Sequence, residues 1–306
     1  MDNRQKIVPH LWFDHQAREA AEFYVATFGG DSRIQATITL SDTPGGDTES
    51  VYFELAGHAF QAISGGPAFT LNPSVSFLLN FDPSRDPDAR AHLDALWARL
   101  AEGGTPLMPL DAYPHSERYG WIQDRYGVSW QLMLTDPEGD PRPFITPMLL
   151  FVGGAYGKAE EAMQFYQAVF DDARQGLVVR FPAGMEPDRE GTIMYADFQL
   201  LDQWFAAMDS AHEHDFTFNE AISLMVQCED QAEIDRYWKQ LSAVPEAEQC
   251  GWVKDRFGVS WQILPAALDE MLLQGTPEQV ARVTQAFLPM KKIDLAALRR
   301  AYAGGS

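Results

Sequence analysis

Apolar and polar residues alternate along the chain with two different periods, which follow one another in a fixed order. A short apolar run at 8–13 is typical of a strand, and apolar residues at three- and four-residue spacings predict a helix over 16–28. Further apolar runs predict strands at 33–40, 50–56 and 59–64. The chain therefore begins with a strand, a helix and three strands, which together form a βαβββ unit.

The same order of elements then recurs. The expected elements are a strand at 75–81, a helix between Asp86 and Gly104, and short strands near 105–110, 120–123 and 129–134. A single βαβββ unit leaves one face of its sheet bare. Two units together are expected to curl eight strands into an open cup with helices on the outer face only, which is an α+β arrangement.

The second half of the chain repeats the first half. Residues 120–134 read GWIQDRYGVSWQLML and residues 251–265 read GWVKDRFGVSWQILP, with nine of 15 positions identical. Shorter matches upstream of these segments recur in the same order, and helices are expected near 158–170 and 230–242. The chain is therefore expected to hold two tandem domains of one kind.

The boundaries of these domains follow from the repeat and from composition. We expect a first domain at 1–135, a linker at 136–144 rich in proline and charge, a second domain at 145–265 and a helical tail at 266–306. The tail contains Thr276-Pro277-Glu278-Gln279, a capping box with proline at the first helical position. The tail is expected to pack over one domain or over the linker.

Charge and cysteine content narrow the possible partners. Asp plus Glu number 44 and Lys plus Arg number 23, so the formal net charge is −21. Such a surface repels phosphate backbones and anionic headgroups, so no nucleic acid and no membrane partner is expected. The expected partner is a small-molecule ligand. Cys228 and Cys250 are the only cysteines and fit a reducing cytoplasm, although a single bridge between them stays open. No secretory signal and no transmembrane helix is predicted.

The twice-repeated run GW-x-x-D-R-[YF]-G-V-S-W-Q, with the Phe-Tyr pair in each first helix, resembles the glyoxalase-like domains of the vicinal oxygen chelate superfamily. The likeness is greatest to the PhnB-like group, often labelled 3-demethylubiquinone methyltransferase-like, as segments 11–14, 62–67 and 290–294 also indicate. The resemblance implies two tandem glyoxalase-like domains. It also implies a homodimer, or a pseudo-dimer of the two copies within one chain. It leaves function open, because the superfamily contains lyases, isomerases, dioxygenases and drug-binding proteins.

Metal-dependent members of that superfamily hold a divalent ion in the cup, and the resemblance carries their ligand positions over to this chain. On the first strand the position falls on Val8 or His10, and strand alternation places His10 in the cup in either case. The second copy has Met148 at this place. On the eighth strand, Gln131 and Gln262 stand where a metal-binding Glu is expected.

The fourth and fifth strands offer weaker donors. The fourth-strand candidates are Gln61, Ile63 and Ser64, or Ala206, Met208 and Asp209, and the fifth-strand candidates are Ser74 and Ser76, or Ala221 and Ser223. The carboxylate that would neutralise a divalent ion is missing, so no cofactor is expected, and His10 and Gln131 stay as residual metal candidates. The cluster at 212–215, His-Glu-His-Asp, lacks the spacing of a metal motif and is expected to be a solvated loop.

Aromatic rings and a few amides then describe a pocket for a planar or amphipathic small molecule. The residues expected to line the two cups are His10, Trp12, Gln61, Ser76, Trp121, Gln131, Met148, Ser223, Trp252 and Gln262. Three functions stay open: a metal-free small-molecule-binding protein, which the missing carboxylate favours; a metal-dependent lyase or isomerase that uses His10 and Gln131; and a structural protein with filled cups. Methyltransferase activity is not expected, because no glycine-rich turn opens a doubly wound sheet.

Overall fold

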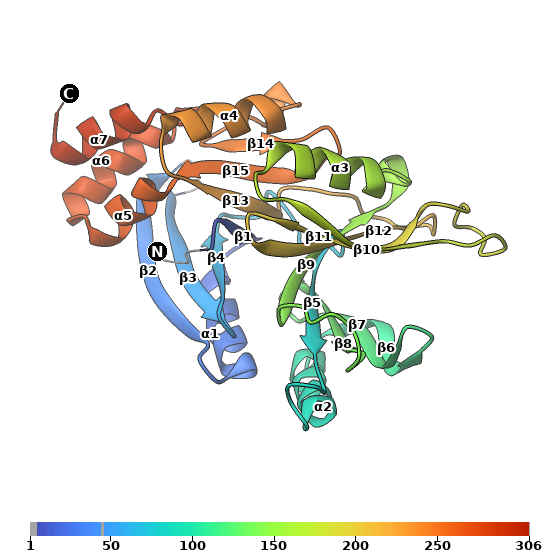
Figure 1. The fold of residues 1–306 in the computed structure, drawn as a ribbon. Helices are drawn as coiled ribbons and strands as arrows, with labels where there is room; N and C mark the ends of the chain where they lie inside the picture. Colours follow the sequence, from blue (N-terminus) through green and yellow to red (C-terminus); the bar gives the residue numbers. More distant parts are fainter. Residues whose placement is uncertain (1–4, 44–45, 306) are drawn as a thin grey trace. The chain divides into compact units, whose positions relative to one another are not determined.

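The computed structural model describes residues 5–43 and 46–305, and the chain forms two compact units (Figure 1). Unit 1 consists of residues 1–25, 31–70 and 219–306, and unit 2 consists of residues 26–30 and 71–218. Each unit therefore takes segments from both sequence repeats.

Unit 1 is built on a seven-stranded mixed sheet in the order β14-β15-β13-β1-β4-β3-β2. Its strands are β1 (Ile7–Phe13), β2 (Arg33–Thr43), β3 (Gly46–Leu55), β4 (His58–Ser64), β13 (Ile222–Cys228), β14 (Trp252–Lys254) and β15 (Ser260–Pro265). Its helices are α1 (Ala17–Phe28, in unit 1 up to Val25), α4 (Gln231–Leu241), the short η2 (Pro245–Ala247), α5 (Ala266–Gln274), α6 (Pro277–Phe287) and α7 (Leu295–Ala303).

Unit 2 is built on an eight-stranded mixed sheet in the order β10-β11-β12-β9-β5-β8-β7-β6. Its strands are β5 (Val75–Phe81), β6 (Thr105–Tyr113), β7 (Ser116–Gln123), β8 (Ser129–Leu134), β9 (Ile145–Phe151), β10 (Arg174–Arg180), β11 (Ile193–Leu200) and β12 (Gln203–Asp209). Its helices are α2 (Ala89–Ala101), η1 (Gly153–Ala155) and α3 (Ala159–Val169).

The fold is the expected α+β arrangement of paired strand–helix–strand units, but the strand pairing exchanges halves between the repeats. In unit 1, β1 pairs antiparallel with β13, and in unit 2, β5 pairs antiparallel with β9. The sequence predicts one cup for each of the segments 1–135 and 145–265, whereas each sheet combines half of one segment with half of the other. Strands β5 and β13 carry the similar apolar runs VSFLL and ISLMV, so hydrophobic pattern does not distinguish them as partners of β1.

The sheet of unit 1 has seven strands where the sequence predicts eight. In unit 2, β6 forms the edge of the sheet by pairing with β7. At the corresponding edge of unit 1, the amides of Cys250 and Gly251 donate hydrogen bonds to the carbonyls of Met290 and Lys291, at 2.7 and 2.8 Å. The C-terminal tail thus satisfies the backbone groups that an edge strand would otherwise satisfy.

The aspartate of the repeated GW-x-x-D-R motif holds the turn before the last strand of each repeat. Asp124 accepts hydrogen bonds from two backbone amides of its own turn and from Trp130 Nε1, the last at 2.7 Å. Asp255 makes the same three contacts, with Trp261 Nε1 at 2.9 Å. Both indoles are fully buried. The most recognisable motif of the sequence therefore has a structural role.

The tail is helical, as predicted, and packs over the sheet of unit 1, where α5 and α6 lie beside β2 and α7 packs against α6 (Figure 1). Helix α6 begins at the predicted capping box, in which Thr276 and Gln279 each bond to the other's backbone amide. Val283 of this helix joins a buried apolar cluster with Val8 and Met225 of the sheet.

Two further expectations concern the whole chain. Cys228 and Cys250 are both free thiols, the first buried and the second half-buried. Within residues 5–43 and 46–305, no helix combines the length and the apolar character needed to cross a bilayer.

Candidate functional site

The inner face of the unit 1 sheet is the face opposite helix α1. Tyr24 of α1 stacks on Phe53 of β3, with ring centroids 6.3 Å apart. Phe53 lies opposite Phe60 in the register of β3 and β4, so the next residue, Gln61, points to the inner face. His10 of β1 lies opposite Gln61 and shares that face.

His10 and Gln61 leave two buried polar atoms without a hydrogen-bond partner. The two side chains are 3% and 9% exposed. Gln61 Nε2 donates to Ser50 Oγ at 2.8 Å, but Gln61 Oε1 and His10 Nδ1 have no partner among the residues that the structure describes. An unpaired buried polar atom costs about 1–3 kcal/mol, so the free energy of these two atoms would fall if each gained a hydrogen bond.

Burial also determines the charge of His10. It lowers the pKa of the imidazole to about 3, because apolar surroundings disfavour the imidazolium form. The ring is therefore neutral at neutral pH and offers one N–H and one lone pair. A base with so low a pKa transfers protons poorly at neutral pH, so the low pKa of His10 favours hydrogen bonding over acid–base catalysis.

Three aromatic rings border this polar pair. Trp252 meets His10 edge to face, with ring centroids 5.6 Å apart. Trp12 lies 6.2 Å from Trp252 and 5.1 Å from Phe69, again in edge contacts. Trp12 is held in place because its Nε1 donates to the carbonyl of Gly66 at 2.7 Å. Both indoles are half-buried, so they provide partly exposed flat surfaces beside a polar pair.

The polar side chains on the other side of His10 are already paired. Ser223 lies opposite His10 in the register of β1 and β13. Gln262 Nε2 donates to Ser223 Oγ at 2.9 Å, and both residues are almost fully buried. The structure thus brings six of the ten expected cup residues together in unit 1. These are His10, Trp12, Gln61, Ser223, Trp252 and Gln262.

Two residues that the sequence did not single out extend the polar surface of this face. Asp269 of α5 is 6% exposed and accepts hydrogen bonds from Tyr52 Oη at 3.1 Å and from Gln227 Nε2 at 2.8 Å. Tyr52 lies opposite Gln61 in the register of β3 and β4. The available signal was an acidic residue within the apolar run AALDEMLLQ, but only the tertiary contact shows what it does.

Unit 2 has apolar side chains where unit 1 has the unpaired polar pair. Met148 and Ala206 lie opposite each other on β9 and β12, as His10 and Gln61 do on β1 and β4. Met148 and Ala206 pack with Leu78 in a small apolar cluster. Among the described residues, none of the unpaired buried side-chain atoms lies in unit 2.

The polar residues expected in unit 2 are fully paired. Gln131 Nε2 donates to Ser76 Oγ at 2.8 Å, and Gln131 Oε1 accepts from Tyr119 Oη at 2.7 Å. Burial raises the pKa of Tyr119 well above its usual value, so its hydroxyl stays protonated and continues to donate. Trp121 Nε1 donates to Ser129 Oγ at 2.7 Å. The expected cup residues of unit 2 therefore form their hydrogen bonds with side chains of the same unit.

The residual metal candidates do not line the same cup. His10 is on β1 in unit 1, whereas Gln131 is on β8 in unit 2. Around His10 the oxygen donors are the neutral groups of Gln61, Ser223 and Gln262, and the last two are bonded to each other. Divalent ions are usually held by three or more ligands that include anionic ones. The described part of the chain contains no group of three His, Cys, Asp or Glu side chains able to hold a metal. These residues do not fit a resident divalent ion.

Two other metal-ligand candidates from the sequence, Asp209 and the 212–215 segment, are engaged in contacts within the protein. Asp209 is 1% exposed and accepts hydrogen bonds from three backbone amides, at 2.8 to 3.2 Å. The 212–215 segment is a loop, in which His214 Nε2 lies 3.0 Å from Ser210 Oγ and His212 lies 3.8 Å from Asp188. Neither place presents a set of free metal ligands.

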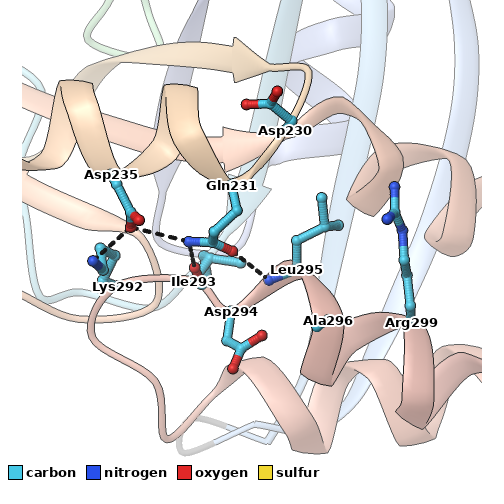
Figure 2. A pocket seen from close by; sticks show the side chains of 9 residues that line it. All are labelled: Asp230, Gln231, Asp235, Lys292, Ile293, Asp294, Leu295, Ala296 and Arg299. Carbon is cyan, nitrogen blue, oxygen red and sulfur yellow. Dashed lines mark hydrogen bonds and ion pairs between the residues drawn. The ribbon is translucent and has the colours of Figure 1, made fainter.

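A separate hollow of about 550 Å³ lies in unit 1 between the start of α4 and the tail (Figure 2). Gln231 spans it, because its Nε2 donates to the carbonyl of Ile293 at 3.0 Å and its Oε1 accepts from the amide of Leu295 at 2.9 Å. Lys292 pairs with Asp235 at 2.6 Å beside this bridge. These contacts of Gln231, Asp235 and Lys292 attach the tail to α4.

Comparison with solved structures defines the class of fold. Glyoxalase I from Zea mays aligns with 86% of this chain and 93% of that chain, with a TM-score of 0.52 and 13% sequence identity. A mutant of the same maize protein aligns with 87% of this chain and 97% of that chain, with a TM-score of 0.53 and 12% identity. At this level of identity the similarity establishes the glyoxalase-like fold alone.

Comparison with protein families identifies the relatives of both repeats. The family described as 3-demethylubiquinone-9 3-methyltransferase matches residues 5–133 and again residues 143–264, so the chain belongs to this PhnB-like family. A putative 3-demethylubiquinone-9 3-methyltransferase, PhnB protein, from Bacillus cereus is 33% identical over 43% of this chain and 100% of that chain, with a TM-score of 0.38. No curated protein matches the chain.

Proposed function

We propose that the protein binds a small organic molecule in the cup of unit 1, without a metal ion held by the protein. The observation that carries this proposal is the pair of unpaired buried atoms, His10 Nδ1 and Gln61 Oε1, beside the rings of Trp12 and Trp252. Two such atoms reduce stability, and a cost of this kind is typically retained where function requires it.

Binding is a better description of this site than chemical conversion. The imidazole of His10 is neutral, and no charged side chain of the described residues contacts it in the cup. The family description names a methyltransferase. However, both sheets are mixed, and neither is the doubly wound parallel sheet with a glycine-rich turn that commonly holds the methyl-donor cofactor. Methyl transfer is therefore not part of the proposal.

The tail supports binding because it excludes water from the part of the inner face next to His10. Val8 and Met225, the inward neighbours of His10 and Ser223 on their strands, are covered by residues of α5 and α6. Hydrogen bonds made beside such an apolar cover are stronger than those made in water.

Titration with neutral aromatic probes tests the proposal. Phenol and benzamide are added separately while intrinsic tryptophan fluorescence and the melting temperature are followed, and indole, which fluoresces like tryptophan, is followed by the melting temperature alone. At least one probe is expected to quench the fluorescence and raise the melting temperature, as a ligand of the folded state does. Trp252→Ala is expected to weaken this binding at least about tenfold, since it removes a ring from the site.

Trp121→Ala is the matched control, because Trp121 lies opposite Gln131 in unit 2 as Trp252 lies opposite Gln262 in unit 1. It is expected to leave binding unchanged. If no probe binds the unmodified protein, or if Trp121→Ala and not Trp252→Ala abolishes binding, the proposal is wrong.

A further inference from the structure

The groups around His10 and Gln61 restrict the charge of the molecule that the cup accepts. The one acidic side chain described above on this face, Asp269, already accepts hydrogen bonds from Tyr52 and Gln227. The polar groups next to the two unpaired atoms are an imidazole, two amides and two hydroxyls, from His10, Gln61, Gln262, Ser50 and Ser223. None of them carries a formal charge at neutral pH. A charged ligand group would lose its hydration here without gaining an opposite charge, which is strongly unfavourable.

The hydrogen bonds already present restrict the ligand further. Gln61 uses its Nε2 to donate to Ser50 Oγ, so its free Oε1 accepts only, and the ligand must donate to it. The second free atom, His10 Nδ1, belongs to the neighbouring strand at the same register position. Adjacent strands are about 4.8 Å apart, so the ligand must carry a second polar atom close to its donor.

The aromatic neighbours restrict its shape. Trp252 touches the His10 ring, and Trp12 and Phe69 continue the aromatic border. Aromatic rings prefer stacked or edge contacts with other flat groups, so a planar ligand is favoured over a bulky aliphatic one.

We propose, on the basis of the binding function above, that the cup of unit 1 recognises uncharged planar molecules with a hydrogen-bond donor and acceptor side by side on one edge, the pattern of an aromatic carboxamide or lactam. The amide N–H of the ligand donates to Gln61 Oε1. The amide oxygen lies toward His10 and accepts from its ring when Nδ1 carries the proton. The flat ring lies against Trp12 and Trp252.

Matched probes test this ligand class. Benzamide carries both groups, acetophenone keeps the ring and the carbonyl but has no donor, and benzoate is charged. Benzamide is expected to bind at least about tenfold more tightly than acetophenone and benzoate, a difference of about 1.4 kcal/mol. Gln61→Leu is expected to remove this preference by weakening benzamide while leaving acetophenone nearly unchanged.

The inference is overturned if benzamide and acetophenone bind the unmodified protein equally, or if Gln61→Leu preserves the preference. Equal binding that Trp252→Ala still weakens would overturn the ligand class but leave the proposed function standing. Absence of binding by all three probes would overturn the ligand class, and the proposed function is contradicted as well only if phenol and indole also fail to bind.

A measurement on the unmodified protein tests the same contact without depending on whether the Gln61→Leu variant folds. In proton–nitrogen NMR spectra that report histidine ring nitrogens, benzamide is expected to shift the His10 signals more than those of the exposed His92. No shift at His10 under saturating benzamide would overturn the proposed contact.

Discussion

Unit 1 and unit 2 are built from copies of the same strands, yet their inner faces differ in what they leave unpaired. In unit 1, His10 and Gln61 each keep a buried polar atom free. In unit 2, the same places hold Met148 and Ala206, and the nearby Gln131 is bonded at both ends of its amide. The comparison shows that two sheets built from equivalent strands differ in how completely their inner faces pair their own polar groups.

The two inner faces also differ in how much of their apolar surface is buried. In unit 1, Leu40 of β2 is 8% exposed within the apolar cluster that the tail completes. In unit 2, Leu177 and Val179 of β10 are 54% and 37% exposed. The repeat itself accounts for the sheets, whereas the unrepeated tail accounts for the deeper burial in unit 1.

Removing an apolar side chain under the tail is expected to have the largest effect. Leu40→Ala should lower the free energy of unfolding by about 2–4 kcal/mol, because it leaves a cavity in the cluster between sheet and tail. Leu177→Ala, on β10 at the edge of the unit 2 sheet, should change it by less than about 0.5 kcal/mol. Urea unfolding followed by circular dichroism measures both. Equal losses would contradict the difference in cover.

Acid should affect unit 1 through His10. The folded-state pKa is about 3 and the ordinary value is 6.5, so between these values the unfolded chain binds a proton that the folded chain does not. Stability therefore falls as pH decreases from about 6.5 toward 3, and the contribution of His10 at about pH 4.5 is about 2–3 kcal/mol.

The variant His10→Met, which copies the residue of unit 2, should remove this part of the acid sensitivity. Met148→His should add a similar sensitivity to unit 2. Urea unfolding at neutral pH and at about pH 4.5 gives the comparison. If His10→Met shows the same loss of stability between the two pH values as the unmodified protein, the interpretation of His10 as a buried neutral ring is wrong.

In unit 2, deleting one hydroxyl group should create an unpaired buried amide oxygen like that of Gln61 in unit 1. Tyr119→Phe removes the donor to Gln131 Oε1 and leaves a buried acceptor unpaired, which should cost about 1–3 kcal/mol. Tyr113→Phe serves as control, because the Tyr113 hydroxyl donates to the carbonyl of Pro109 at an exposed position. A Tyr119→Phe protein as stable as the control would mean that unit 2 does not depend on this bond.

Divalent ions should have the smallest effect. Because the donors around His10 are neutral, EDTA treatment followed by an excess of Ni²⁺, Zn²⁺ or Mg²⁺ should leave the melting temperature within about 1 °C, since a ligand that does not bind the folded state does not stabilise it. A metal-dependent rise that His10→Met abolishes would show that unit 1 is a metal site after all.

Much of the site could be predicted because strand alternation depends only on local spacing. It predicted His10 on the inner face, whereas Gln61 was predicted from the resemblance, and the repeat predicted that Gln131 and Gln262 occupy equivalent positions of the two copies. Prediction failed where a residue depends on a distant segment: Asp269 gains its role only because α5 crosses the inner face and meets Tyr52.

The sequence by itself determined the repeated units, the turn held by Asp124 and its counterpart Asp255, and the start of α6 at Thr276. All of these depend on residues close together along the chain. Only the tertiary structure decided that β1 pairs with β13 and that the tail covers unit 1, because edges of similar pattern compete for the same partner. It also decided that His10 Nδ1 and Gln61 Oε1 stay unpaired, because hydrogen-bond satisfaction depends on which side chains neighbouring strands bring together.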